Sequence, residues 1–175
     1  MKLKSQAIYF LFVRYLFLVL IAINNLWLFY AIFTPLTVYP VFSILSLFFS
    51  ASLSGTVISF SNFSINLVEA CIAGSAYYLL LVLNLSTPMP MKKRFFSFIF
   101  SFISLLVVNI IRILFFSFLF VSAFSLFNLT HLIFWYFLSA IIVFLIWFVT
   151  IKLFEIKEIP VYSDVKFLLK DIKKR

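Results

Sequence analysis

Hydrophobic residues form long runs along this chain, and short polar or proline-containing segments separate them. The first run extends from about Ala7 to Phe33 and stops before Pro35. Later runs cover about residues 71–85, 95–121 and 129–151. Because about 20 apolar residues in a helix cross the hydrocarbon core of a bilayer, we interpret each run as one membrane-spanning helix.

Two segments between the first and second runs have a different pattern. Val41–Leu53 follows Pro40, is only about 13 residues long and contains several serines, which favours an interfacial or re-entrant segment over a full crossing. In Thr56–Val68, apolar and small polar residues alternate around Ser61-Asn62, which predicts a short β-hairpin. The hairpin is expected outside the hydrocarbon core, because lipid cannot solvate an open sheet edge.

Composition supports a membrane protein. Hydrophobic residues make up 66% of the chain, charged residues 11%, and the mean hydropathy is +1.24. A length of 175 residues leaves room for one domain. We therefore expect an all-α integral membrane protein with a single transmembrane domain, residues 1–175, of about four helices. Five helices remain the alternative if residues 41–53 also span the membrane.

The charge distribution predicts the orientation of these helices. The net charge is +9, and the basic residues lie in the N-terminal segment, at residues 92–94 and in a tail at residues 152–175. The connections at residues 34–70 and 122–130 contain no Lys or Arg. By the positive-inside rule, both termini and the tail face the cytoplasm, which four crossings satisfy. This explanation of the charge leaves no argument for a nucleic-acid partner.

Few side chains in this chain could carry out chemistry, and three of them are predicted to lie at one depth. Arg112 lies 18 residues after Arg94, or roughly 27 Å along a helix. His131 precedes Lys152 by 21 residues, or roughly 31 Å. Cys71, the only cysteine, begins the run that ends at the basic segment 92–94. All three therefore belong near the extracytoplasmic boundary of a hydrocarbon core about 30 Å thick.

These three residue types can together support acyl transfer. A helix start and a nearby cation would favour the thiolate of Cys71, His131 could exchange its proton, and Arg112 could stabilise an oxyanion. Each residue also has a structural interpretation. Cys71 could be a small buried residue, Arg112 could pair with Glu69 or reach the headgroups, and His131 could belong to a wet helix start.

Three sequence elements resemble the exosortase/archaeosortase family of membrane-embedded cysteine transpeptidases. Val68–Gly74 (VEACIAG) resembles the family's Ala-Cys-x-Gly signature, although the glycine follows Cys71 by three residues instead of two. Asn109–Ile113 (NIIRI) resembles its Asn-x-x-Arg-Ile motif, and His131 opens the next predicted helix. The resemblance covers about residues 40–147. It implies that Cys71 is the nucleophile, Arg112 the stabilising cation and His131 the proton-transfer group.

The resemblance also implies the substrates of such an enzyme. They are secreted proteins that end in a short motif, a transmembrane helix and a basic tail. The enzyme would cleave near the motif through a cysteine thioester and transfer the acyl group to an anchoring acceptor, with a membrane lipid as one candidate.

Supporting roles are predicted for three further residues. Asn109 is expected to orient Arg112 from the preceding turn, Glu69 to serve the helix start, and Gly74 to shape the backbone near the thiol. We expect no cofactor and no metal, because one cysteine and one histidine on different helices do not form a zinc site. The competing hypothesis is a non-catalytic membrane subunit, a transport or assembly partner, with a structural Glu69–Arg112 ion pair.

Overall fold

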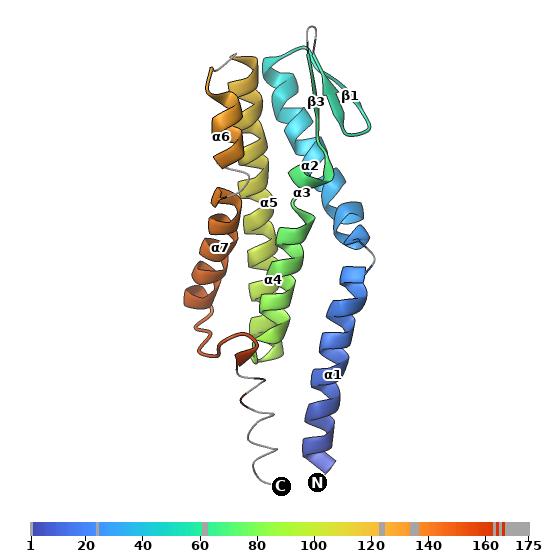
Figure 1. Cartoon of the computed structure of the whole chain (residues 1–175), viewed down its shortest axis with the longest axis vertical. Helices are drawn as coiled ribbons and strands as arrows, with labels where there is room; N and C mark the ends of the chain where they lie inside the picture. The colour runs from blue at the N-terminus through green and yellow to red at the C-terminus, as the bar shows by residue number, and fades with distance from the viewer. Residues whose placement is uncertain are drawn as a thin grey trace.

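Helices dominate the computed structural model, which describes residues 2–23, 25–60, 63–122, 125–133, 137–162, 164 and 166 (Figure 1). The described helices are α1 (Lys2–Ile23), α2 (Trp27–Phe48), α3 (Glu69–Ile72), α4 (Gly74–Ser86), α5 (Met91–Val121), α6 (Phe127–Ile133) and α7 (Ser139–Leu153). The described strands are β1 (Ser52–Ser54), β2 (Val57–Ser59) and β3 (Ser64–Asn66). The protein is therefore mostly helical with one small sheet, so the prediction of a hairpin within a helical fold is confirmed.

The first two helices differ from the prediction in where the break falls. The helix predicted from Ala7 to Phe33 is interrupted before Trp27, where Asn25 and Leu26 adopt left-handed backbone conformations with φ of 46° and 56°. Such conformations cannot continue a right-handed helix. The predicted end at Pro35 is wrong, because α2 continues through it.

The interfacial or re-entrant segment predicted at Val41–Leu53 is also wrong. Helix α2 contains both Pro35 and Pro40 and ends at Phe48, and the end of the predicted segment enters β1. Each proline removes one backbone donor, but neighbouring helices can support a helix that contains proline. Helix α2 has such support, since Val41 and Leu45 are fully buried in the core.

The sheet is an antiparallel meander in the order β1-β2-β3. Gly55, with φ of 63°, lies in the turn between β1 and β2. The central residue Ile58 faces Leu53 on one side and Ile65 on the other. The turn predicted at Ser61-Asn62 lies outside the described residues.

Small polar residues hold α5 against its neighbours. They lie at intervals of four or eight residues on its buried face, where Ser97, Ser101, Asn109 and Ser117 are all buried and Leu105 and Ile113 occupy the positions between. Asn84 of α4 donates to Ser97 Oγ at 2.7 Å, and the hydroxyls of Ser101 and Thr150 of α7 lie 3.0 Å apart. Small residues with interhelical hydrogen bonds are the usual packing device of helices in membranes.

The predicted helix from Leu129 to Ile151 is two helices in the structure. Helix α6 ends at Ile133 and α7 begins at Ser139, and residues 134–136 lie outside the described part. His131 therefore lies in the last turn of a short helix, not at the start of a long one.

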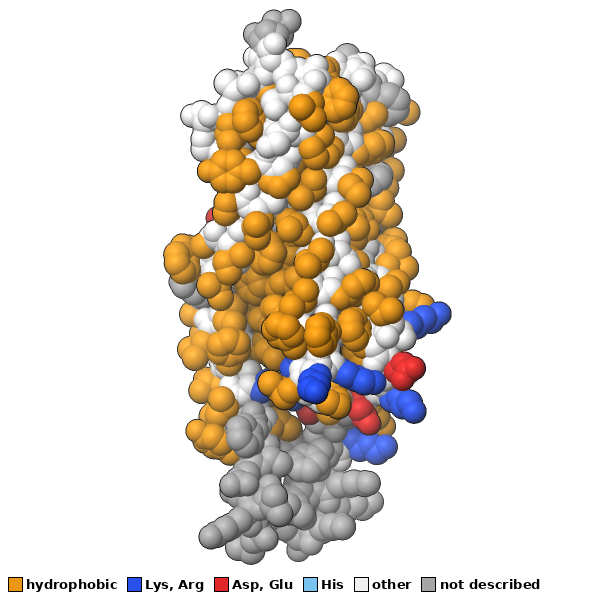
Figure 2. All heavy atoms as spheres, turned by 180° about the vertical axis from the view of Figure 1, so that it is seen from behind, with side chains coloured by type: hydrophobic (Ala, Val, Ile, Leu, Met, Phe, Trp, Pro, Cys, Tyr) orange, Lys and Arg blue, Asp and Glu red, His pale blue; other side chains and the backbone are white. Residues whose placement is uncertain are grey.

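The chain runs four times between the two ends of the molecule (Figure 1). The α1–α2 pair, the α3–α4 pair, α5 and the α6–α7 pair form the four passages, and α1 begins and α7 ends toward the end opposite the sheet. Figure 2 shows hydrophobic side chains over most of the visible face, with charged side chains gathered toward one end. Two described helices, α2 and α5, are long and apolar enough to cross a membrane.

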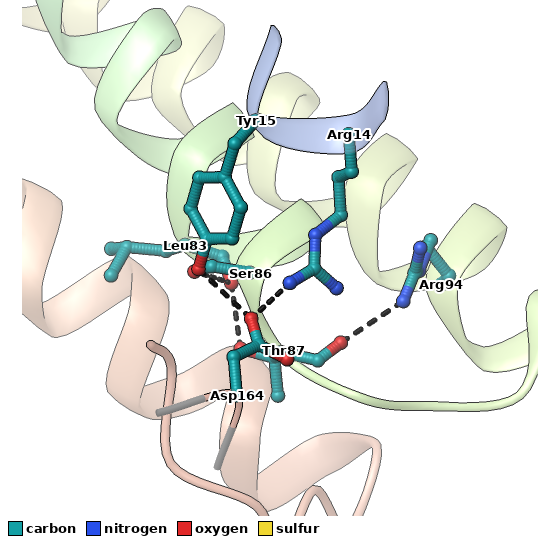
Figure 3. Close-up of polar contacts among 7 residues, drawn as sticks. All are labelled: Arg14, Tyr15, Leu83, Ser86, Thr87, Arg94 and Asp164. Carbon is teal, nitrogen blue, oxygen red and sulfur yellow. Dashed lines mark hydrogen bonds and ion pairs between the residues drawn. The ribbon is translucent and has the colours of Figure 1, made fainter. Parts of the chain in front are cut away.

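The tail after α7 folds back onto this charged end (Figure 3). Asp164 pairs with Arg14 and accepts a hydrogen bond from the hydroxyl of Tyr15 at 2.9 Å. Beside this pair, Arg94 donates to the carbonyl of Thr87 at 3.0 Å. The tail predicted at residues 152–175 is thus anchored to α1 in its described part, and residues 163, 165 and 167–175 lie outside that part.

We expect Asp164→Asn to loosen the tail. Asp164 and Arg14 have side chains only 9% and 17% exposed, so the substitution leaves the arginine without its counter-charge in a mostly buried place. Tryptic cleavage after Lys157 should become several-fold faster. Glu155→Gln is the matched control, since it removes the same charge from an exposed position of the same segment. Equal cleavage rates in both variants would contradict the anchoring role of Asp164.

Candidate active site

A cavity of about 310 Å³ lies between β3, α3, α5 and α6. Cys71 of α3, Arg112 of α5 and His131 of α6 all line it. The structure therefore brings together the three residues that the sequence marked as the candidate catalytic set. Helix α5 continues beyond Arg112 to Val121, roughly 14 Å further along its axis. The cavity follows this last part of the helix, since Phe116 and Phe120 also line it.

Cys71 is a free, half-buried thiol in the third position of α3. Its backbone amide donates to the carbonyl of Val68 at 2.7 Å. The prediction that Cys71 opens the long helix ending near Leu85 is wrong, because α3 ends at Ile72 and α4 starts at Gly74. Four residues are too few for an appreciable helix dipole, so the thiol depends on its side-chain neighbours for activation.

The break between α3 and α4 explains the displaced glycine of the sequence. Ala73, two residues after Cys71, has φ of 62° and ψ of 37°, a left-handed conformation that favours glycine. Gly74 is needed for a different reason. A Cβ atom at this position would lie 2.7 Å from the ring of Tyr30. In the turn after the thiol, an alanine therefore adopts the left-handed conformation, and the glycine that follows it makes room for the Tyr30 ring.

We expect Gly74→Ala to destabilise the protein by about 1–2 kcal/mol, because the Tyr30 ring must move to admit the new methyl group. Ala73→Gly should instead stabilise it by up to about 1 kcal/mol by relieving the left-handed backbone. Thermal unfolding in detergent measures both changes. In a Tyr30→Leu background the cost of Gly74→Ala should shrink, and an unchanged cost would show that the ring is not the obstacle.

Asn109 supports the backbone beside the thiol. Its side-chain amide is buried and donates to the carbonyl of Cys71 at 2.8 Å. The sequence predicted that Asn109 orients Arg112, whereas its observed hydrogen bond fixes α3 against α5. The residue therefore acts on the position of Cys71.

Arg112 is half-buried, and its side chain lines the same cavity as Cys71. Its Nη1 donates to Ser139 Oγ, the first residue of α7, at 2.8 Å. Glu69 is exposed, and among the described residues it forms no ion pair with Arg112. The Glu69–Arg112 pair of the competing hypothesis is therefore not formed in the described structure, and the guanidinium lies at the cavity.

Aromatic rings fix the imidazole of His131. Its ring stacks on Phe127, with centroids 5.7 Å apart and an interplanar angle of 9°. Phe116 meets it edge-on, with centroids 5.1 Å apart and an angle of 89°. Both phenylalanines also line the cavity. Sequence reasoning missed Phe116, Phe127 and Ser139, because a chain with 27 phenylalanines and many serines gives no signal for particular ones.

The described residues contain no group of three or more His, Cys, Asp or Glu side chains that could hold a metal ion. The described lining of the cavity carries the thiol of Cys71, the imidazole of His131 and the guanidinium of Arg112, beside the side chains of Ser64, Asn66 and Ser117. Comparisons with known protein families, with curated proteins and with solved structures find no match for this chain.

Proposed function

We propose that this protein is a membrane-embedded cysteine protease or transpeptidase of the exosortase/archaeosortase type. The observation that carries the proposal is the convergence of Cys71, Arg112 and His131 on one cavity from three different helices. An intramembrane arginine is costly and functional by default, and here it lies near the only cysteine and the only histidine of the chain.

The proposed reaction has two steps. In the first, His131 takes the thiol proton and the Cys71 sulfur attacks the scissile carbonyl, whose oxyanion Arg112 stabilises. The amine leaves with the proton from His131, and a thioester remains on Cys71. In the second step, water or the nucleophile of an acceptor displaces the sulfur, and the thiol is restored.

The proposed location is the cell membrane, with both termini cytoplasmic and the cavity toward the extracytoplasmic side. The length and apolar character of α2 and α5 support membrane insertion. The charged residues near one end of the molecule and the absence of Lys and Arg from residues 34–70 support the orientation.

The proposed substrates follow from the family resemblance of the sequence. They are secreted proteins with a C-terminal motif, a transmembrane helix and a basic tail, and the acceptor is a membrane lipid or another surface anchor. A substrate helix of this kind would lie in the bilayer beside the enzyme, with its basic tail on the cytoplasmic side. That arrangement would present the motif at the level of the cavity.

Mass spectrometry of the protein purified from cells that contain its substrates tests the thioester step. We expect a peptidyl adduct on Cys71 that neutral hydroxylamine removes, since the reagent cleaves thioesters. The adducts should share one C-terminal sequence. Continued substrate cleavage without any adduct at Cys71, even after rapid acid quenching, would contradict covalent catalysis.

The alternative of a non-catalytic subunit has lost its main structural argument. It relied on an ion pair between Glu69 and Arg112, but Arg112 is bonded to Ser139 and Glu69 is exposed. A polar contact between α5 and α7 alone does not account for the thiol and imidazole that share the cavity.

A further inference from the structure

One edge of the small sheet borders the candidate active site. Strand β3 is the last strand of the β1-β2-β3 order, so its second edge pairs with no strand in the described part of the chain. Ser64, Ile65 and Asn66 of this strand all line the cavity that holds Cys71. From Asn66 the chain leads directly through Val68 into α3.

The hydrogen-bonding pattern shows which backbone groups of β3 face this open edge. The amide of Leu67 donates to the carbonyl of Thr56 at 3.0 Å, so these two residues form a hydrogen-bonded pair at the end of the β2–β3 ladder. Such pairs alternate along an antiparallel ladder, so Ile65 bonds to β2 while Ser64 and Asn66 turn their backbone groups away from it.

Three of these outward groups have no partner among the described residues. The carbonyl of Asn66 accepts from the amide of Val68 at 3.1 Å. The amides of Ser64 and Asn66 donate no hydrogen bond to the described part of the chain, and the carbonyl of Ser64 accepts none from it. Unpaired backbone groups along a strand edge are the template for adding another strand.

The walls of the cavity indicate what kind of chain would fit. They are mainly apolar, with Ile113, Phe116, Phe120 and Phe127 among the lining residues. Among the described residues of the lining, Arg112 supplies the guanidinium and none supplies a carboxylate. The cavity therefore suits an extended, largely apolar segment without lysine or arginine, whose carbonyl oxygens can approach the guanidinium.

We propose that the substrate polypeptide binds as a fourth strand on the free edge of β3, which places its scissile carbonyl beside Cys71. This inference rests on the proposed function for the identity of the site. Main-chain hydrogen bonds to Ser64 and Asn66 would supply affinity for any sequence, and the apolar walls would select side chains at alternate positions. A lipid chain could fill the same walls, but it would bury the edge groups without partners at a cost in free energy.

Thiol labelling tests this proposal without a known substrate, because Cys71 is the only cysteine of the chain. The probes are a short apolar peptide chloromethyl ketone and the small reagent iodoacetamide, both applied to the full-length protein in detergent. Ser64→Pro removes the outward amide but leaves the β2–β3 ladder intact, since proline is tolerated at such edge positions. Ser64→Ala keeps the amide and is the matched control.

We expect Ser64→Pro to slow labelling by the peptide probe about five- to tenfold, the scale of one lost edge hydrogen bond. Labelling by iodoacetamide should stay within about twofold in both variants, and the peptide probe should label Ser64→Ala faster than Ser64→Pro, because the alanine variant keeps the outward amide. Equal labelling of the proline and alanine variants by the peptide probe would overturn the proposal. So would a long-chain alkyl chloromethyl ketone that labels faster than the peptide and is insensitive to Ser64→Pro.

A second measurement uses the wild-type protein, so it does not depend on the folding of a variant. N-methylation of the peptide probe at successive residues should slow labelling at alternate positions only, because alternate amides of an added strand face β3. A uniform effect at all positions would overturn the proposal. Neither labelling experiment measures substrate processing. Strand addition can therefore fail while Cys71 proves catalytic in a processing assay, and strand addition can be supported while the processing assay finds no role for Cys71.

Discussion

Cys71→Ser is expected to lower the processing of a signal-bearing substrate by about 10³-fold or more. A serine hydroxyl in place of the thiol is a far weaker nucleophile, and loss of the nucleophile removes the covalent pathway as a whole. The measurement is the rate of cleavage of a co-expressed or co-reconstituted substrate that carries a C-terminal motif, an apolar helix and a basic tail.

The serine variant should keep its fold, because the two side chains are close in size and Cys71 is only half-buried. Expression level and thermal unfolding in detergent should match the wild type. Ser75→Ala, at an exposed position of α4 near the cysteine, serves as the matched control and should process substrate normally. Undiminished cleavage by Cys71→Ser would refute the assignment of the nucleophile, whatever the cavity binds.

The course of the backbone could be predicted where polarity and periodicity are strong. The apolar runs predicted helices, and the alternation around Ile58 and Ile65 predicted the hairpin that the structure contains. The ends of the first helices differ from the prediction because the helix breaks at the left-handed Asn25 and Leu26, which the sequence does not signal, and continues through Pro35. A proline removes one hydrogen bond, which packed neighbours can offset, whereas left-handed residues cannot continue a right-handed helix and therefore separate α1 from α2.

The candidate site was easier to predict than the boundaries of the helices that form it. Cys71, Arg112 and His131 stand out because reactive side chains are scarce in an apolar chain. Their neighbours could not be predicted, since the contact of Arg112 with Ser139 depends on where α7 begins. The left-handed Ala73 was hidden for a similar reason, because alanine gives no sequence signal for that conformation.

Arg112→Gln should lower substrate processing by about 10²–10³-fold, the usual cost of removing a group that stabilises an oxyanion. Glutamine keeps an N–H donor but loses the positive charge, and because its side chain is shorter than that of arginine, the loss of the contact with Ser139 is measured separately in Ser139→Ala. Arg112→Lys keeps the charge but loses the planar set of donors, and it should be less impaired than Arg112→Gln.

A purely structural role for Arg112 makes the opposite prediction. In that case Ser139→Ala, which removes the hydrogen-bond partner, should impair the protein as much as Arg112→Gln does, and both should lower thermal stability in parallel. If Arg112 acts on the substrate, Ser139→Ala should reduce processing less than about tenfold, the scale of one lost hydrogen bond. Exchanging the charges in Glu69→Arg with Arg112→Glu should restore nothing, because the two side chains form no ion pair in the described structure.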